Sequence, residues 1–262
     1  MTTHDLSLDL SNDFPTELAR HVVVVADRFA HFADGEHVVT LSDLPVLVAA
    51  DGCAWVVHVG QGIERVDWRT LESVCLHAEA APVRIAEPEA LVGCWVAPQT
   101  VHKLRPENVL LANVRNPAVG RCAADLRIHR ENELIIDHHT GEHVQGMVIV
   151  EAMRQICFAQ FETGYRPQLP PYAYAGVWKR IDLCFQEFLF ALPGTVVSEI
   201  ATADLSRERN LRFQTRTAVW QNGREVASAE IEYAMVDQAR FETLERKKAA
   251  QAARAYLSTF AE

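Results

Sequence analysis

The sequence lacks the features that would point to a membrane, secreted or zinc-binding protein. No apolar stretch reaches the ~20 residues needed to cross a bilayer. The first residues, MTTHDLSLDL, carry no basic segment followed by an apolar run, as a secretory signal would. The six cysteines occur at no CxxC spacing, and several lie within apolar runs. We therefore expect reduced core cysteines, no zinc motif and a cytoplasmic location.

Positive charge is also scarce. The chain has 25 Lys and Arg residues against 35 Asp and Glu residues, which gives a net charge of −10 at pH 7. A nucleic-acid partner is not expected, because it would need a basic face. With 49% hydrophobic and 23% charged residues the composition is that of a soluble globular protein, and 262 residues suffice for one large domain or two small ones.

The N-terminal part, residues 1–95, is expected to form a small α/β unit. It contains short valine-rich runs at His21–Phe29, Val46–Ala50 and Cys53–Val59, and a helix is expected at Trp68–Ala80. Proline and alanine residues at Ala81–Pro88 indicate a boundary. No residue of this region can be assigned to chemistry.

The second part, residues 96–237, predicts an α+β domain in which one long helix is wrapped by an antiparallel sheet. The helix is expected from Val144 to Glu162, where Thr163–Gly164 and the prolines that follow end it. A two-residue hairpin turn is expected at Asn222–Gly223. Residues 238–262 should form a C-terminal helix. The strands are expected at Asn108–Val114, Arg121–His129, Ala175–Cys184, Phe185–Leu192, Thr195–Ser206, Leu211–Gln221 and Arg224–Val236. This order is the plan of a hotdog fold.

The segment Asp137–Gln155, DHHTGEHVQGMVIVEAMRQ, carries the most information about function. Glu151 and Arg154 are the only charged residues between Gly146 and Phe161. They lie three residues apart and so share one helix face. Burying a charge costs several kcal/mol unless the charge is paired. The two residues are therefore either a structural pair or part of a reaction centre.

As a catalytic residue, Glu151 could act as a general base on a hydroxyl or orient a substrate. A base needs a raised pKa near neutral pH, which burial would supply, whereas Arg154 would hold the acid ionised. The planar guanidinium of Arg154 could bind a phosphate or a thioester carbonyl. A purely structural salt bridge remains the alternative for both residues.

Polar residues precede this helix and should lie near its N-terminus, where the helix dipole favours an oxyanion. His138 and His143 are the candidates to polarise a substrate carbonyl, Asp137 is a candidate binding residue, and Gly146 would let the backbone approach a ligand. We assign His139 to the surface. The spacing of the histidines and acids matches no common metal-binding motif, so no metal is expected.

Three motifs resemble those of the A-factor biosynthesis hotdog (AfsA-like) family, which includes γ-butyrolactone synthases. They are VHKLRPENVLL (Val101–Leu111), DH…EHVQGM (Asp137–Met147) and VEAMRQ (Val150–Gln155). The resemblance implies transfer of a β-ketoacyl group from an acyl carrier protein to a hydroxyl of dihydroxyacetone phosphate. It implies no bound cofactor, because the acyl group arrives on phosphopantetheine or coenzyme A.

Family members of this type carry two hotdog units, whereas this sequence has one recognisable unit. The N-terminal half is either a diverged hotdog or another fold, and a single unit would pair with a second copy as a homodimer. Lys103 could bind a phosphate or be a solvated charge, and Trp178 could line an acyl tunnel or pack in the core. Because carrier proteins are usually acidic, a docking patch would have to be local, for example among the arginines of Arg115–Arg130.

Two other functions remain open. GMVIVEAMRQ is also similar to the PGVLxxEAxAQ helix of carrier-protein dehydratases, although the proline before Gly146 is missing; a dehydratase or thioesterase is therefore an alternative. The other alternative is a non-catalytic acyl-binding or scaffold protein.

Overall fold

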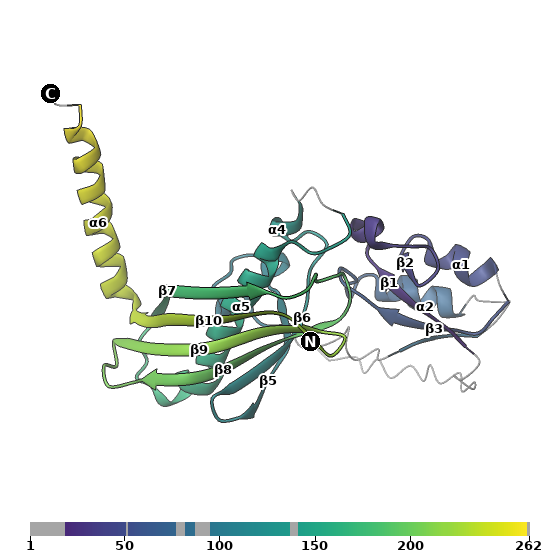
Figure 1. Ribbon diagram of the computed structural model, residues 1–262, viewed down its shortest axis with the longest axis horizontal. Coiled ribbons are helices and arrows are strands. Elements are labelled where there is room, and N and C mark those ends of the chain that lie inside the picture. Colours follow the sequence, from purple (N-terminus) through teal and green to yellow (C-terminus); the bar gives the residue numbers. More distant parts are fainter. Residues whose placement is uncertain (1–18, 51, 77–81, 87–94, 137–140, 261–262) are drawn as a thin grey trace, which may run out of the picture.

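Two sheets organise the chain and lie side by side (Figure 1). The computed structural model describes residues 19–50, 52–76, 82–86, 95–136 and 141–260. The first sheet belongs to the N-terminal part of the chain. The second sheet wraps the long helix, and a final helix extends away from it.

The first sheet is parallel and has the order β2-β1-β3-β4. Its strands are β1 (Arg20–Val25), β2 (Val38–Thr40), β3 (Trp55–Val59) and β4 (Val83–Ile85). Helices α1 (Leu44–Ala50) and α2 (Trp68–Leu76) make the crossovers, and a 3-10 helix spans Asp27–Phe32. Continuous valine runs suit such a sheet, because parallel strands are buried on both faces. The α/β prediction is confirmed, and the diverged-hotdog alternative for this region is not what the structure has.

The valine-rich run Val46–Ala50 lies in helix α1 and not in a strand. A short apolar run has no clear period, and Pro45 favours the first turn of a helix. Helix α2 starts at Trp68 as predicted. The rest of the predicted helix, from residue 77, lies outside the described residues.

The second sheet is antiparallel and has the order β5-β6-β8-β9-β10-β7. Its strands are β5 (Leu111–Ala118), β6 (Arg121–Leu126), β7 (Tyr174–Phe185), β8 (Gly194–Asp204), β9 (Asn210–Gln221) and β10 (Arg224–Asp237). Helix α5 (Gly146–Gln160) packs across it against β5, β6, β8 and β9 (Figure 1). Asn222 and Gly223 both have positive φ, 52° and 74°, as the predicted two-residue hairpin requires. The α+β hotdog prediction is confirmed.

Helix α5 presents one face to the sheet and leaves a second face half-exposed. Its buried residues include Val148, Ala152, Met153 and Ile156. The chain continues as a π turn at Phe161–Tyr165 and a 3-10 turn at Arg166–Gln168. Shorter helices precede α5: the 3-10 turns Pro98–Val101 and Pro106–Asn108, and α4 (Glu133–Ile136).

The predicted strand Phe185–Leu192 is wrong beyond Phe185, where β7 ends. The backbone N–H groups of Gln186 and Glu187 both donate to the carbonyl of Val226, and the backbone of Phe190 bonds the side chain of Gln221. The hydrogen bonds of this segment go to separate groups and do not follow one neighbouring strand, so the segment is an irregular loop.

The C-terminal helix α6 (Gln238–Ser258) extends away from the sheet (Figure 1). The Asp237 carboxylate accepts a hydrogen bond from the Arg240 N–H and caps the helix. None of its residues is buried. Within the described parts of the chain, no helix is both long and apolar enough to cross a membrane.

Candidate active site

The half-exposed face of α5 runs beside β7, the edge strand of the hotdog sheet. A Cβ at Gly176 would collide with the ring of Phe158, and a Cβ at Gly146 would lie 2.9 Å from Cζ of Phe185. Phe158 and Gly146 lie near opposite ends of α5, and their partners lie near opposite ends of β7. Helix α5 and strand β7 therefore run antiparallel beside each other. Because β7 is the edge strand, the half-exposed face of α5 lies at a free edge of the sheet.

Glu151 lies on this face within a cluster of donors. Arg154 donates from Nε to Oε2 at 2.7 Å and from Nη2 to Oε1 at 2.8 Å. Lys103 Nζ lies 2.7 Å from Oε1, and Gln155 Nε2 donates to Oε1 at 3.0 Å. The structure thus brings together three of the predicted site residues, Lys103, Glu151 and Arg154.

The same helix residues hold the VHKLRPENVLL segment. Arg154 Nη2 donates to the carbonyl of Val101 at 3.0 Å, and Gln155 Nε2 donates to the carbonyl of Asn108 at 2.8 Å. Gln155 Oε1 accepts from the N–H of Leu110 at 2.8 Å. Two motifs that are about forty residues apart in the sequence therefore form one hydrogen-bonded unit. Gln155 is a structural residue of the site that sequence reasoning missed, although it ends the VEAMRQ motif.

The electrostatics of Glu151 differ from the expectation for a general base. Burial by itself would raise the pKa of Glu151, but hydrogen bonds and charge from Arg154, with the bonds from Lys103 and Gln155, outweigh burial and lower the pKa. Of the two opposing influences expected from the sequence, burial and Arg154, the second prevails because three donors converge on one carboxylate. Glu151 is an ionised anchor for two cations.

At the other end of the face, the first turn of α5 lies among exposed apolar side chains. Gln145 occupies the N-cap position and its side chain makes no capping hydrogen bond. Met147, Phe185 and Phe188 are 58%, 51% and 67% exposed. The ring of His143 lies 4.9 Å from that of Phe188. Phe185 and Phe188 were not predicted site residues, because their segment was interpreted as a strand.

The remaining predicted residues are distributed as follows. Trp178 lies on β7 opposite Tyr233, and its buried Nε1 has no hydrogen-bond partner among the described residues. Asp137 and His138, and the surface candidate His139, lie outside the described residues. Across the part of the chain that is described, no three His, Cys, Asp or Glu side chains are grouped to hold a metal.

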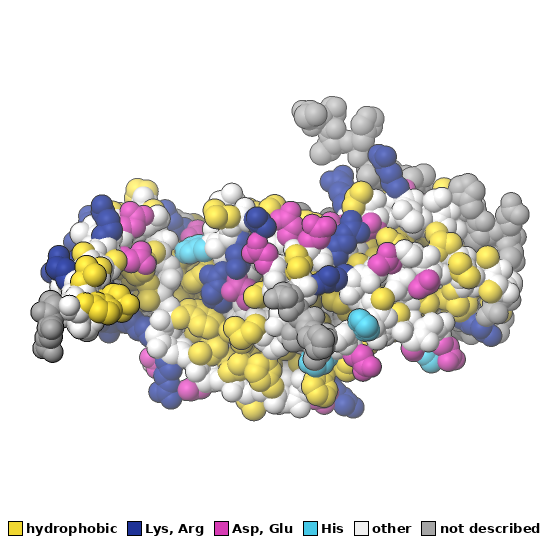
Figure 2. Space-filling view, turned by 90° about the horizontal axis from the view of Figure 1, so that it is seen from above, with side chains coloured by type: hydrophobic (Ala, Val, Ile, Leu, Met, Phe, Trp, Pro, Cys, Tyr) yellow, Lys and Arg dark blue, Asp and Glu magenta, His cyan; other side chains and the backbone are white. Residues whose placement is uncertain are grey.

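Most arginines of the expected docking patch are engaged in ion pairs. Arg115 pairs with Asp125 at 2.8 Å, Arg121 with Glu199 at 3.1 Å, and Arg130 with Asp67 at 3.1 Å. Basic and acidic side chains also intermingle over the face seen in Figure 2. A carrier protein would therefore meet no large basic surface on this face.

The strand order and the central buried helix define a hotdog-fold protein. The A-factor biosynthesis hotdog domain matches residues 86–237, more than half of the 262-residue chain, and the chain belongs to this family. The resemblance indicated by the three motifs is confirmed. Family and fold together support an enzyme that acts on acyl thioesters. No curated protein matches the sequence.

Several solved structures align with the chain at low identity. A phenylacetic acid degradation-related protein from Ralstonia eutropha is 17% identical, with 47% of this chain and 83% of that chain covered and a TM-score of 0.36. A mutant thioesterase from Pseudomonas aeruginosa is 13% identical (47% and 80% covered, TM-score 0.35). Zebra fish thioesterase superfamily member 2 is 12% identical (47% and 80%, TM-score 0.35). The fold assignment rests on the family match and the strand order.

Proposed function

We propose that the protein transfers a β-ketoacyl group from an acyl carrier protein, or from coenzyme A, to a hydroxyl acceptor such as dihydroxyacetone phosphate. The observation that carries this proposal is the first turn of α5, which has no side-chain cap and lies between His143 and exposed apolar side chains. An acyl thioester has the matching chemistry: a carbonyl that develops negative charge and an apolar chain.

In this reaction the thioester carbonyl would accept hydrogen bonds from N–H groups of the first turn of α5, which also supplies the positive end of the helix dipole. The acyl chain would lie against Met147, Phe185 and Phe188. The acceptor oxygen would attack the carbonyl carbon, and the proton of the acceptor hydroxyl would pass to His143. His138 would help to polarise the carbonyl. When the carbon–sulfur bond breaks, the proton passes to the departing thiolate.

The Glu151 cluster would bind the acceptor. The hydrogen bonds of Arg154 to described residues use Nε and Nη2, so Nη1 is available for a phosphate oxygen, with Lys103 beside it. Glu151 follows Gly146 by five positions, a rise of about 7.5 Å along a helix, which is comparable to the length of a three-carbon phosphate ester. Glu151 orients both cations, and the Nε1 of Trp178, which has no partner among the described residues, would be a further donor to the substrate.

A homodimer would complete the site. The β5 edge of the sheet is protected by two register shifts and Pro117, whereas β7 is a twelve-residue strand with one irregularity, opposite Glu232 and Tyr233. Long open edges pair readily with another strand. A second copy placed along β7 would cover the half-exposed face of α5.

The test is product analysis of a β-ketoacyl carrier protein incubated with the enzyme, with and without dihydroxyacetone phosphate. We expect unloading of the carrier that depends on the acceptor and yields an ester phosphate. Arg154→Gln should raise the KM for the acceptor, whereas Arg254→Gln, on the exposed helix α6, should not. Hydrolysis or loss of water without acceptor would instead identify a thioesterase or dehydratase, and saturable binding without product would identify an acyl-binding protein.

A further inference from the structure

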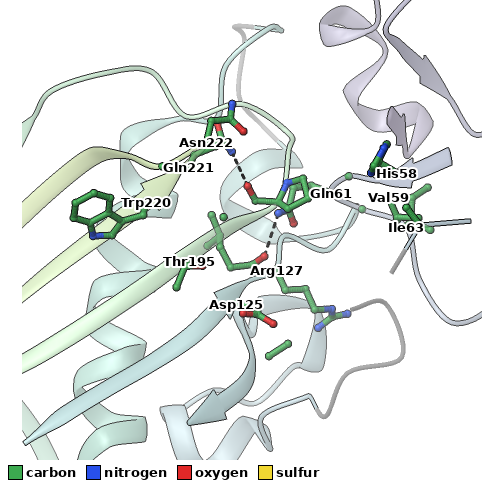
Figure 3. Close-up of a pocket in the computed structure, with 18 of the residues that line it drawn as sticks. His58, Val59, Gln61, Ile63, Asp125, Arg127, Thr195, Trp220, Gln221 and Asn222 are labelled. Atoms are coloured by element: carbon green, nitrogen blue, oxygen red, sulfur yellow. Dashed lines mark hydrogen bonds between the residues drawn. The ribbon is translucent and has the colours of Figure 1, made fainter. Parts of the chain in front are cut away.

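A cavity of about 550 Å³ lies between the N-terminal unit and the hotdog sheet (Figure 3). Three walls enclose it. His58 and Val59 come from the end of β3, Asp125 and Arg127 from the end of β6, and the turn at Asn222 from the hairpin between β9 and β10. None of the described residues that line it belongs to α5 or to the proposed acyl-transfer site.

The topology places this cavity at a position that commonly binds ligands. It lies beyond the carboxyl ends of β3 and β4, since Gly60, Gln61 and Ala86 line it. In the sheet order β2-β1-β3-β4, strand β2 lies on one side of β1 and strand β3 on the other, so the order of the strands reverses at β1. Ligands of open α/β sheets bind at the carboxyl edge near such a reversal, and cavities between domains are frequent binding sites.

Arg127 supplies the chemistry of the cavity. Its terminal nitrogens, Nη1 and Nη2, are shielded from solvent and have no hydrogen-bond partner among the described residues. Asp125, which lines the same wall, is engaged by Arg115 at 2.8 Å and by Asn113 at 2.8 Å. Burial lowers the pKa of Arg127 to about 10 against the opposing charges of Glu64 and Glu107, so the guanidinium is still charged at neutral pH. Glu64 and Glu107 act on this cation through their charge, but its terminal N–H groups make no hydrogen bond and remain for an anionic ligand to accept.

Trp95 covers this cation. The guanidinium of Arg127 lies over the indole ring, which is 38% exposed and also lines the cavity. Stacking on an indole satisfies the face of a guanidinium and leaves the N–H groups at its edge unpaired. A carboxylate or phosphate can accept two of these N–H groups side by side.

We propose that this cavity binds a small anion, a phosphate ester or a carboxylate, through the guanidinium of Arg127, with Trp95 moving aside to admit it. The site is separate from the acyl-transfer site and does not depend on that function.

The test is calorimetric titration of the full-length protein with inorganic phosphate and with malonate, with chloride at matched ionic strength as the blank. We expect saturable binding of at least one of the two anions and a change in tryptophan fluorescence on binding. The anion that binds more tightly distinguishes a phosphate site from a carboxylate site. Arg127→Gln should weaken binding at least tenfold, whereas Arg121→Gln should leave it within twofold.

Two further variants distinguish binding at this cavity from binding at the proposed acceptor site. Trp95→Ala removes the cover and should retain or tighten binding. Arg154→Gln alters the acceptor site and should leave calorimetric binding at the cavity unchanged. Arg127→Gln should unfold at the same temperature as the wild type or higher, since it removes a shielded charge whose terminal N–H groups make no hydrogen bond with the described residues. Absence of saturable binding, unchanged binding in Arg127→Gln, or loss only in Arg154→Gln would overturn the proposal.

Discussion

At the scale of single residues, Gly176 on β7 sets how closely α5 approaches the sheet edge. Its missing side chain is replaced by the ring of Phe158, and any Cβ would overlap that ring. We expect Gly176→Ala to lower the free energy of unfolding by about 1–3 kcal/mol, as overpacking does. Gly164→Ala is the matched control, since a Cβ there meets no atom within 4 Å. Equal stability of the two variants in urea unfolding would contradict this role of Gly176.

The lowered pKa of Glu151 predicts that the stability of the fold depends on pH. Because the folded pKa is lowered, the charge of Glu151 stabilises the fold above the unfolded pKa of about 4.3, and this contribution is lost as pH falls through the folded value. Glu151→Gln leaves Arg154 and Lys103 without a counter-ion, and we expect a loss of about 1–3 kcal/mol at pH 7. The difference from wild type in denaturant unfolding should shrink between pH 5 and pH 3. A difference that stays constant with pH would show that the charge is not responsible.

At the scale of elements, Gln61 joins the two sheets. Its Nε2 donates to the carbonyls of Leu126 and Leu192 at 3.1 and 2.9 Å, and its Oε1 accepts from the N–H of Ile128 at 2.7 Å. The side chain is buried, so its removal leaves backbone groups unsatisfied.

We expect Gln61→Leu to cost about 2–4 kcal/mol and to accelerate amide hydrogen exchange at Ile128. Gln251→Ala, on the exposed helix α6, is the control and should change stability by less than about 0.5 kcal/mol. Unaltered exchange at Ile128 in Gln61→Leu would show that the two units dock without this residue.

The elements that the sequence predicts well are those whose signals are local. Helix α5 is set by its apolar period and the prolines beyond it, and the Asn222–Gly223 turn by its two residue types. Phe185–Leu192 could not be predicted, because the hydrogen-bond partners of that segment lie in distant parts of the chain, on β9 and β10 and at Gln61 and Val144. The same holds for the site. The spacing of Glu151 and Arg154 in the sequence predicts that they share a helix face, but Lys103, which helps to lower the pKa of Glu151, comes from a distant segment.

At the scale of the whole molecule, the open edge at β7 predicts self-association. We expect light scattering to give twice the 29.3 kDa chain mass. Hydrogen exchange of β7 amides should slow as protein concentration rises, whereas that of β5, at the protected edge, should not change. A monomer at all concentrations, or equal behaviour of both edges, would rule out pairing through β7.

The packing of the two units against each other could not be predicted from the sequence. The valine runs predict a buried sheet, but nothing in them indicates that the loop after β3 docks on the hotdog sheet or that Arg127 lies beside a cavity there. Such contacts join residues such as Gln61 and Leu192, and no local pattern records them.

The order of the strands has a consequence for how the protein is made. Strand β7 pairs with β10, the last strand of the chain, and Phe185 lies opposite Ala227. Until β10 has been synthesised, β7 has no neighbour within its own sheet, and the apolar helix α5 beside it is incompletely covered. Pairings between distant segments form slowly, and exposed apolar surface and unpaired edges promote aggregation meanwhile. Chains that end before Arg224, and so lack β10, should therefore accumulate as insoluble protein, whereas chains that lose only α6 should fold.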